Sequence, residues 1–259
     1  MGKFKTFAKY LALFAGAIGG GLGIGWAATD GVDAYYKSQD NGLALLAPHV
    51  HLKKGTHRVV ISDQFYEMLT FETEKTDQDL AINGIKKAYE NLNEHLWGIN
   101  FELCTTANGL DEYGIKKVDT INKEDLPLYM TTEIIDNNKN VLAKTDWDYN
   151  YFGRELKEES ITFRKTPLFT VYKIYKTDEE TMNPLNTYAY TITTHETLHA
   201  LGLPHTESKD SIMYPYISLS SPKDLTEKDI EILKTYCTTF YGEKTAENSS
   251  SKLEEEITL

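Results

Sequence analysis

Three histidines and one glutamate fall within an eleven-residue segment, spaced so that the histidines could bind one metal ion. Segment 195–205 reads HETLHALGLPH. His195 and His199 are four residues apart, so on a helix both imidazoles project from one face. Gly202 can adopt the positive φ that ends a helix, and the chain can then bring His205 back as a third ligand. Three neutral imidazoles leave the fourth tetrahedral position to water, which is typical of a catalytic zinc site.

Glu196 follows the first histidine and lies off the ligand face, so it can act on the zinc-bound water. We predict that it takes the water's proton as general base and returns it to the leaving group as general acid. The alternative is a surface helix with incidental histidines. By average residue usage, the array with Gly202 and His205 arises by chance in on the order of one chain in 100,000, which disfavours that alternative.

A second motif follows: residues 211–215 read SIMYP. The extended histidine motif followed by S-x-M-Y-P resembles the metzincin metallopeptidases, and among them is most similar to the matrixins. The resemblance places Met213 in a tight turn beneath the zinc and the segment beginning Pro215-Tyr216 in the wall of the pocket beside the cleaved bond. A small hydroxyl residue after the third histidine, here Thr206, is usual in matrixins.

The surrounding pattern predicts the elements that would position these residues. Strands are expected at 57–62, 100–104, 128–134, 161–164 and 169–174, where β-branched and aromatic residues concentrate. Helices are expected at 76–97, from 183–186 to about 201, and at 225–234. The resemblance covers roughly residues 50–241. It implies an α+β fold: a twisted mixed β-sheet with an active-site helix, a Met-turn and a C-terminal helix.

The chain divides into four predicted parts. Residues 1–28 carry three lysines followed by nineteen uncharged residues from position 10. They suit either a signal peptide cleaved after Ala27 or an uncleaved membrane anchor. Both alternatives place the catalytic part outside the cytoplasm, secreted or membrane-anchored. Residues 29–56 are expected to be a linker or N-terminal arm, 57–241 the peptidase domain, and 242–259 a disordered acidic tail.

Several smaller features bear on partners and ions. The net charge of −12 argues against nucleic acid and anionic membrane surfaces as partners. In an exported protein Cys104 and Cys237 can form a disulfide, and the alternative is two buried thiols. Segments 136–140 and 146–148 are acid-rich loops of the kind in which matrixins often carry calcium, without assignable ligands. The pair His49 and His51 has no neighbours that would complete a metal site.

The predicted function is that of a zinc-dependent endopeptidase acting on extracellular proteins or peptides. Two alternatives remain at this point. The first is a zinc-binding regulatory or binding protein that keeps the fold with little turnover, which the intact Glu196 disfavours. The second is a zinc amidohydrolase acting on a non-peptide amide, which the Met-turn disfavours only through the family resemblance.

Overall fold

The computed structural model describes residues 51–137, 141–149, 156–165, 188–216 and 224–245. These residues belong to one compact unit that begins at His49. The predicted leader or anchor at 1–28, the strand at 169–174, the first residues of the active-site helix and most of the tail lie outside the described residues. None of the helices in the described part of the chain has the length and apolar character needed to span a membrane.

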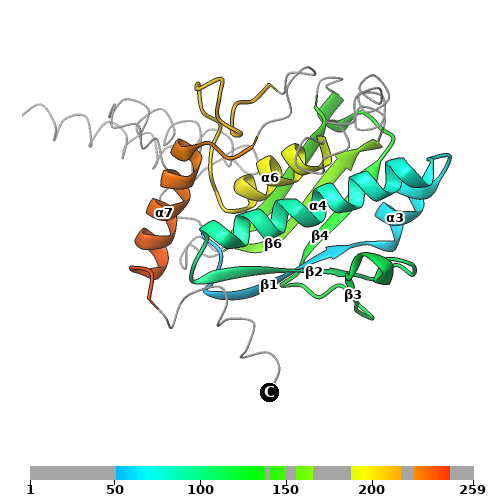
Figure 1. Ribbon diagram of the computed structural model, residues 1–259, viewed down its shortest axis with the longest axis horizontal. Helices are drawn as coiled ribbons and strands as arrows, with labels where there is room; N and C mark the ends of the chain where they lie inside the picture. The colour runs from blue at the N-terminus through cyan, green and yellow to red at the C-terminus, as the bar shows by residue number, and fades with distance from the viewer. Residues whose placement is uncertain (1–50, 138–140, 150–155, 166–187, 217–223, 246–259) are drawn as a thin grey trace, which may run out of the picture. The chain divides into compact units, whose positions relative to one another are not determined.

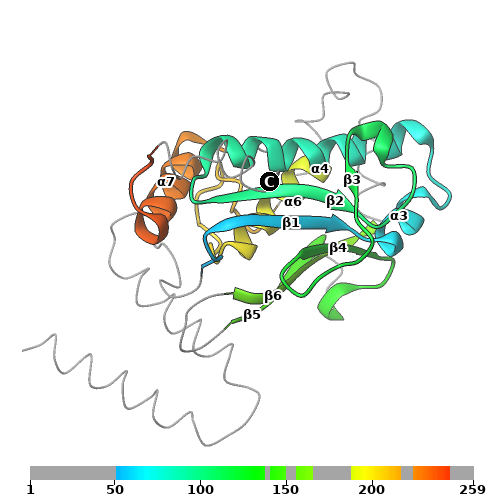
Figure 2. The same ribbon diagram turned by 90° about the horizontal axis from the view of Figure 1, so that it is seen from below.

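A six-stranded mixed sheet forms the centre of this unit (Figures 1 and 2). Its strands are β1 (Gly55–Ile61), β2 (Ile99–Thr105), β3 (Lys116–Lys117), β4 (Leu126–Thr131), β5 (Ala143–Tyr149) and β6 (Leu156–Arg164). Their spatial order is β3-β2-β1-β4-β6-β5. The first five strands in that order pair in parallel, whereas β5 runs antiparallel to β6 and lies at an edge. The mixed sheet of the predicted α+β fold is confirmed.

The two central strands, β1 and β4, contain short runs of apolar residues, as expected for parallel strands that are covered on both faces. Val59, Val60 and Ile61 in β1 are fully buried. Their neighbour β4 contributes buried Leu128 and Met130. This apolar centre supports the helices that carry the chemistry.

Helices pack on the sheet and at its ends (Figures 1 and 2). They are α3 (Asp63–Thr70), α4 (Lys75–His95), α6 (Tyr188–Ala200) and α7 (Glu227–Tyr241), with short 3-10 turns η2 (Asp111–Tyr113) and η3 (Ile135–Asn137). The helix α4 contacts β2, α6 and α7, while α6 also contacts β5 and β6. The side of α4 that faces these elements is apolar, with Leu80, Ile85, Ala88, Tyr89 and Leu92 buried.

The prediction for segment 146–148 was wrong, because these residues belong to strand β5 and not to a loop. Lys144 and Asp146 are two residues apart, so they share one face of the strand, and their side chains form an ion pair at 2.9 Å. The intervening Thr145 projects to the other face, toward α6. Charged residues at alternate positions are typical of an edge strand, so the same acids that suggested a loop mark the edge of this sheet.

Other boundaries also differ from the predictions. The short helix α3 was missed; its first turn is capped by Ser62, whose Oγ accepts from the amide of Phe65 at 3.1 Å. The strand predicted at 128–134 runs instead from Leu126 to Thr131. The closing helix predicted at 225–234 continues to Tyr241. Its last turn packs Phe240 and Tyr241 against the segment that contains His51 and Leu52.

Residues 51–56, predicted to be part of the arm, pack with this unit. The amide of buried Leu52 donates to the Tyr236 hydroxyl at 3.3 Å, and the Tyr241 hydroxyl donates to the Leu52 carbonyl at 2.8 Å. The His51 ring stacks on Phe240 with centroids 4.5 Å apart. His49, its partner in the histidine pair, lies outside the described residues.

Both cysteines are free and buried, so the disulfide alternative is not formed. Cys104 lies in β2, and Cys237 lies in α7. The Cys237 sulfur accepts from the amide of Trp97 at 3.5 Å. Burial is the largest effect on each thiol and raises its pKa to about 11, so both thiols stay protonated near neutral pH.

Candidate active site

The helix α6 carries the first two candidate ligands and is buried almost throughout, with His199 half-buried. Each of these histidines is oriented by a backbone carbonyl. The Nδ1 atom of His195 lies 2.7 Å from the carbonyl of Ile212, and that of His199 lies 2.8 Å from the carbonyl of Leu203. Because a carbonyl can only accept, each Nδ1 carries the proton and each Nε2 presents a lone pair.

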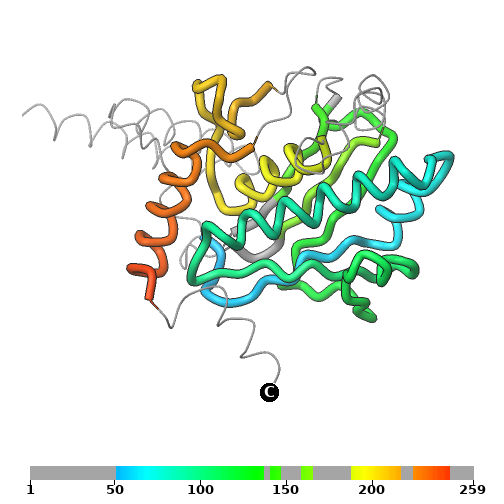
Figure 3. The backbone as a smooth tube through the Cα atoms, viewed as in Figure 1, coloured from blue at the N-terminus to red at the C-terminus, as the bar shows by residue number. Residues whose placement is uncertain are grey.

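A sharp turn follows α6 and reverses the chain (Figure 3). Gly202 has a φ of +84°, the left-handed region that the sequence predicted for it. The amide of Gly202 donates to the carbonyl of His199 at 2.8 Å, and the amide of Leu203 donates to that of Leu198 at 3.0 Å. These bonds satisfy carbonyls at the end of the helix and direct the chain toward exposed His205.

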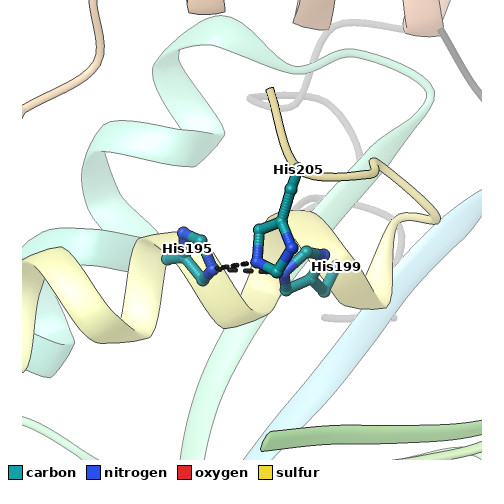
Figure 4. Close-up of side chains that lie close together, drawn as sticks. All are labelled: His195, His199 and His205. Atoms are coloured by element: carbon teal, nitrogen blue, oxygen red, sulfur yellow. Dashed lines mark hydrogen bonds between the residues drawn. The ribbon is translucent and has the colours of Figure 1, made fainter. Parts of the chain in front are cut away.

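The three imidazoles converge on one point (Figure 4). The Nε2 atom of His195 lies 3.2 Å from Nε2 of His205, and the two remaining Nε2 pairs, both involving His199, are each 3.1 Å apart. Two nitrogens bound to one tetrahedral zinc at about 2.0–2.1 Å lie about 3.3–3.4 Å apart, close to these separations. Nε2 lone pairs that face one another repel unless a cation lies between them, so the donor set fits zinc.

The protonation state of the cluster agrees with this geometry. The pKa of His199 lies well below its usual value, first because the half-buried ring has lost solvent around it and then because His195 and His205 are close to it. Its bond to the Leu203 carbonyl opposes this shift without reversing it. Neutral imidazole is the form that binds metal. Among the residues that the structure describes, these three form the one group of His, Cys, Asp or Glu with ligand atoms close enough to hold a metal.

Glu196 is buried beside the first histidine, with 6% of its surface exposed. The hydroxyl of Thr145, on strand β5, lies 2.7 Å from Oε2 of Glu196 and 2.9 Å from its main-chain carbonyl. Burial raises the pKa of Glu196 to about 7, helped by the nearby charge of Asp146 and opposed by the bonds from Thr145. A carboxyl group whose pKa is near neutrality can accept a proton and release it again at physiological pH.

The segment around Met213 is hydrogen-bonded to the parts of the chain that carry His195 and His205. Met213 is buried, and its carbonyl accepts from the amide of Thr206 at 3.0 Å, so the two sides of the loop are joined next to His205. The amide of Ile212 donates at 3.2 Å to Asp229, a buried residue in the first turn of α7. The same peptide segment therefore orients His195 through its carbonyl and is held by α7 through its amide.

Asp229 was not singled out from the sequence, although it connects the turn to the closing helix. Its carboxylate also accepts from the Ser211 hydroxyl, and from the amide and hydroxyl of Thr226 at 2.9 and 2.7 Å. With Thr226 it forms a capping box at the start of α7. The T-x-x-D spacing was the signal that could have identified it.

The predicted pocket wall and calcium loops are less completely described. Pro215 and Tyr216 are exposed, Tyr216 by 71%, and the Tyr216 ring lies edge-on to Tyr214 with centroids 5.7 Å apart. In the acid-rich segments, Asp136 lies in η3 at 3.2 Å from the Lys144 ammonium, and the same ammonium pairs with Asp146. No calcium site is assigned.

Comparison with known protein families identifies a similarity over the second half of the domain. Residues 123–237 match the family model described as Peptidase_M10, Matrixin. The matched region begins just before β4, contains the three histidines and Met213, and ends within α7. A search of curated proteins found no match. Residues 123–237 are therefore similar to the matrixins, a family of zinc metalloproteases, and the mixed sheet flanked by helices is consistent with the metzincin fold.

Proposed function

We propose that the protein is a zinc-dependent endopeptidase that hydrolyses peptide bonds of extracellular proteins or peptides. The observation that carries the proposal is the convergence of the Nε2 atoms of His195, His199 and His205, 3.1–3.2 Å apart, beside buried Glu196. Zinc held by these nitrogens would polarise the scissile carbonyl and lower the pKa of a bound water toward neutrality.

In the proposed mechanism, two backbone carbonyls orient the zinc ligands and Glu196 transfers the proton. The Ile212 and Leu203 carbonyls hold His195 and His199 with their lone pairs directed to one point. The Glu196 carboxylate takes the proton of the attacking water as the new C–O bond forms. It then delivers that proton to the amine nitrogen as the C–N bond breaks, and so returns to its starting state.

Strand β5 supports a peptide over a small amide as substrate. It is the last strand in the sheet order, and it contacts α6 where Thr145 meets Glu196. Within the described part of the chain, the outer side of β5 pairs with no other strand. An exposed strand edge binds extended peptides through main-chain hydrogen bonds. This favours the endopeptidase over the amidohydrolase alternative.

The place of action is part of the proposal and rests on the sequence alone. The three lysines followed by nineteen uncharged residues support export, with the catalytic domain outside the cytoplasm. N-terminal sequencing of the protein recovered from its native source tests this. A start at Ala28 would support a cleaved signal, an intact N-terminus in the membrane fraction would support an anchor, and a cytoplasmic protein would contradict both.

The activity test uses the full chain and a library of quenched fluorescent peptides. We expect cleavage that stops when a chelator removes zinc and returns when zinc is restored. His205→Ala should lower both bound zinc and cleavage, because it removes one of the three ligands. His95→Ala is the matched control: it removes a histidine at the end of α4, and both zinc content and cleavage should stay at the wild-type level.

The outcomes separate the proposal from its alternatives. Zinc-loaded, folded protein that cleaves no peptide in the library would favour a binding or regulatory role. Hydrolysis of small acylated amines without cleavage of peptides would favour the amidohydrolase. Cleavage that persists after complete removal of metal would contradict the zinc mechanism itself.

A further inference from the structure

The carboxylate of Glu196 is held by a side chain from a different layer of the fold. Thr145 lies on β5, and its hydroxyl approaches Oε2 of Glu196 at 2.7 Å. The same hydroxyl lies 2.9 Å from the main-chain carbonyl of Glu196. One group on the sheet edge therefore contacts both the backbone and the side-chain terminus of one residue on α6.

The single hydroxyl proton is shared between two acceptors, and both of them belong to Glu196. A glutamate side chain has three rotatable bonds, and helix geometry by itself leaves several of its conformations open. A hydroxyl close to both the carbonyl and Oε2 selects conformations in which the carboxylate lies against β5. Among the described residues, Thr145 supplies the one side-chain donor that reaches this carboxylate.

The sheet fixes Thr145 in turn. Thr145 pairs with Ile161 of β6, and the flanking residues Lys144 and Asp146 form an ion pair with each other on the opposite face. Threonine also suits the position, because its β-branched side chain favours a strand and has few rotamers. The position of the hydroxyl is therefore fixed by the paired backbone of β5 and by the few rotamers of threonine.

We propose that Thr145 is a positioning residue that holds the Glu196 carboxylate in the orientation needed for proton transfer during peptide hydrolysis. This inference rests on the proposed function, and it makes β5 part of the catalytic apparatus as well as of the sheet. Displacement of a reacting group by about 1 Å can lower turnover about 100-fold. Loss of the hydroxyl should therefore reduce kcat and leave substrate affinity largely unchanged.

Three substitutions test the proposal in the full-length, zinc-loaded protein. Thr145→Val keeps the shape and removes the hydroxyl, so we expect kcat to fall about 10- to 100-fold with KM within about twofold. Thr145→Ser keeps the hydroxyl and should retain kcat within about threefold. Thr162→Val is the matched control: Thr162 lies on the adjacent strand, paired with Lys144, and its substitution should leave kcat unchanged.

Further measurements separate positioning from a merely structural role. Zinc content and melting temperature should be the same for Thr145→Val and wild type. Combined with Glu196→Gln, Thr145→Val should cause little further loss, because both changes act through one carboxylate. If Thr145→Val proves unstable, Thr145→Ala removes the same hydroxyl with a smaller side chain.

Two results would overturn the inference. The first is a Thr145→Val enzyme with kcat within twofold of wild type; the second is a loss of kcat that zinc loss or unfolding fully explains. If wild-type protein cleaves no peptide, the proposed function fails. Crystal structures of the Val and Ser variants would still test positioning, because Glu196 should change conformation in the first and keep it in the second.

Discussion

Two carboxyl groups in this domain are buried in different surroundings: Glu196 lies beside the histidine cluster, and Glu159 lies on β6 near tyrosines of α4 and α7. Burial raises the pKa of Glu196 to about 7 and that of Glu159 to about 8. Glu196 accepts a hydrogen bond from Thr145, whereas Oε1 of Glu159 is buried without a hydrogen-bond partner among the described residues. Burial is common to both groups, so the raised pKa alone does not mark a functional residue; the partner and the neighbouring histidines do.

The surroundings of Glu159 show why it contributes no chemistry in the proposed mechanism. Within the described part of the chain, the titratable groups that interact with it include the hydroxyls of Tyr89 on α4 and of Tyr236 and Tyr241 on α7. Burial raises the pKa of each of these tyrosines, so they stay neutral over the physiological range. Burial is the cause of the raised pKa of Glu159, and among the described residues no positively charged group is found to oppose it, so ionisation of Glu159 costs stability.

The largest difference between Glu196 and Glu159 should be in the effect of their substitution on kcat. Glu196→Gln removes the proposed proton acceptor, and we expect kcat to fall by roughly 10²–10⁴-fold with zinc retained. Glu159→Gln, the matched change at the other site, should leave kcat within about twofold. Steady-state kinetics with metal analysis checks both, and comparable losses in the two variants would remove the distinction drawn here.

A third buried carboxylate, Asp229, extends the comparison to a fully bonded group. Asp229→Ala would leave the Ile212 amide and the Ser211 hydroxyl without their acceptor in the interior. We expect a loss of about 3 kcal/mol in the free energy of unfolding. Asp229→Asn keeps one acceptor oxygen and should lose less. Urea denaturation measures both, and a loss below about 1 kcal/mol in the alanine variant would show that these bonds contribute little.

The raised pKa of Glu159 should make the stability of the folded domain depend on pH. Its pKa is raised from 4.5 to about 8 in the folded protein, so the folded state favours the protonated form. Its contribution to stability is therefore complete below about pH 4.5 and is lost as the pH rises toward 8. Glu159→Gln should raise the unfolding free energy by about 2 kcal/mol at pH 8.5 and change it little at pH 4.5. Equal effects at both pH values would contradict the assignment.

The smallest expected effect concerns the hydroxyl donor at the start of α7. Thr226 bonds Asp229 much as Thr145 bonds Glu196, but its role is to cap a helix. Thr226→Ala should lower the unfolding free energy by about 1 kcal/mol and leave kcat unchanged. Loss of the Thr145 hydroxyl should instead lower kcat and leave the stability unchanged. Thermal unfolding and kinetics on the two variants compare a capping threonine with a positioning one.

How much of the molecule was predictable depended on how local the signal was. The cluster of His195, His199 and His205 could be predicted because its spacing is set by one helix and one glycine turn. The helix α4 could be predicted from its apolar period. For α6, which is buried on nearly all sides, the histidine motif gave the signal.

The parts that sequence reasoning missed depend on contacts between distant residues. Thr145 and Glu196 are 51 positions apart, and Asp229 is 17 positions from Ile212. The T-x-x-D spacing could mark Asp229 as a capping residue, but no spacing rule predicts either contact before the fold is known. Strand β5 itself was taken for a loop because its acidic residues alternate along one face, a pattern whose meaning depends on knowing that the strand lies at an edge.

The two buried thiols have a practical consequence. Cys104 and Cys237 are both inaccessible and protonated near neutral pH in the folded domain, and they lie on different elements, β2 and α7. A thiol-specific reagent can modify either one only when its element opens. The relative rates at which the two residues are labelled would therefore distinguish detachment of the C-terminal helix from opening of the whole domain, with no probe added to the chain.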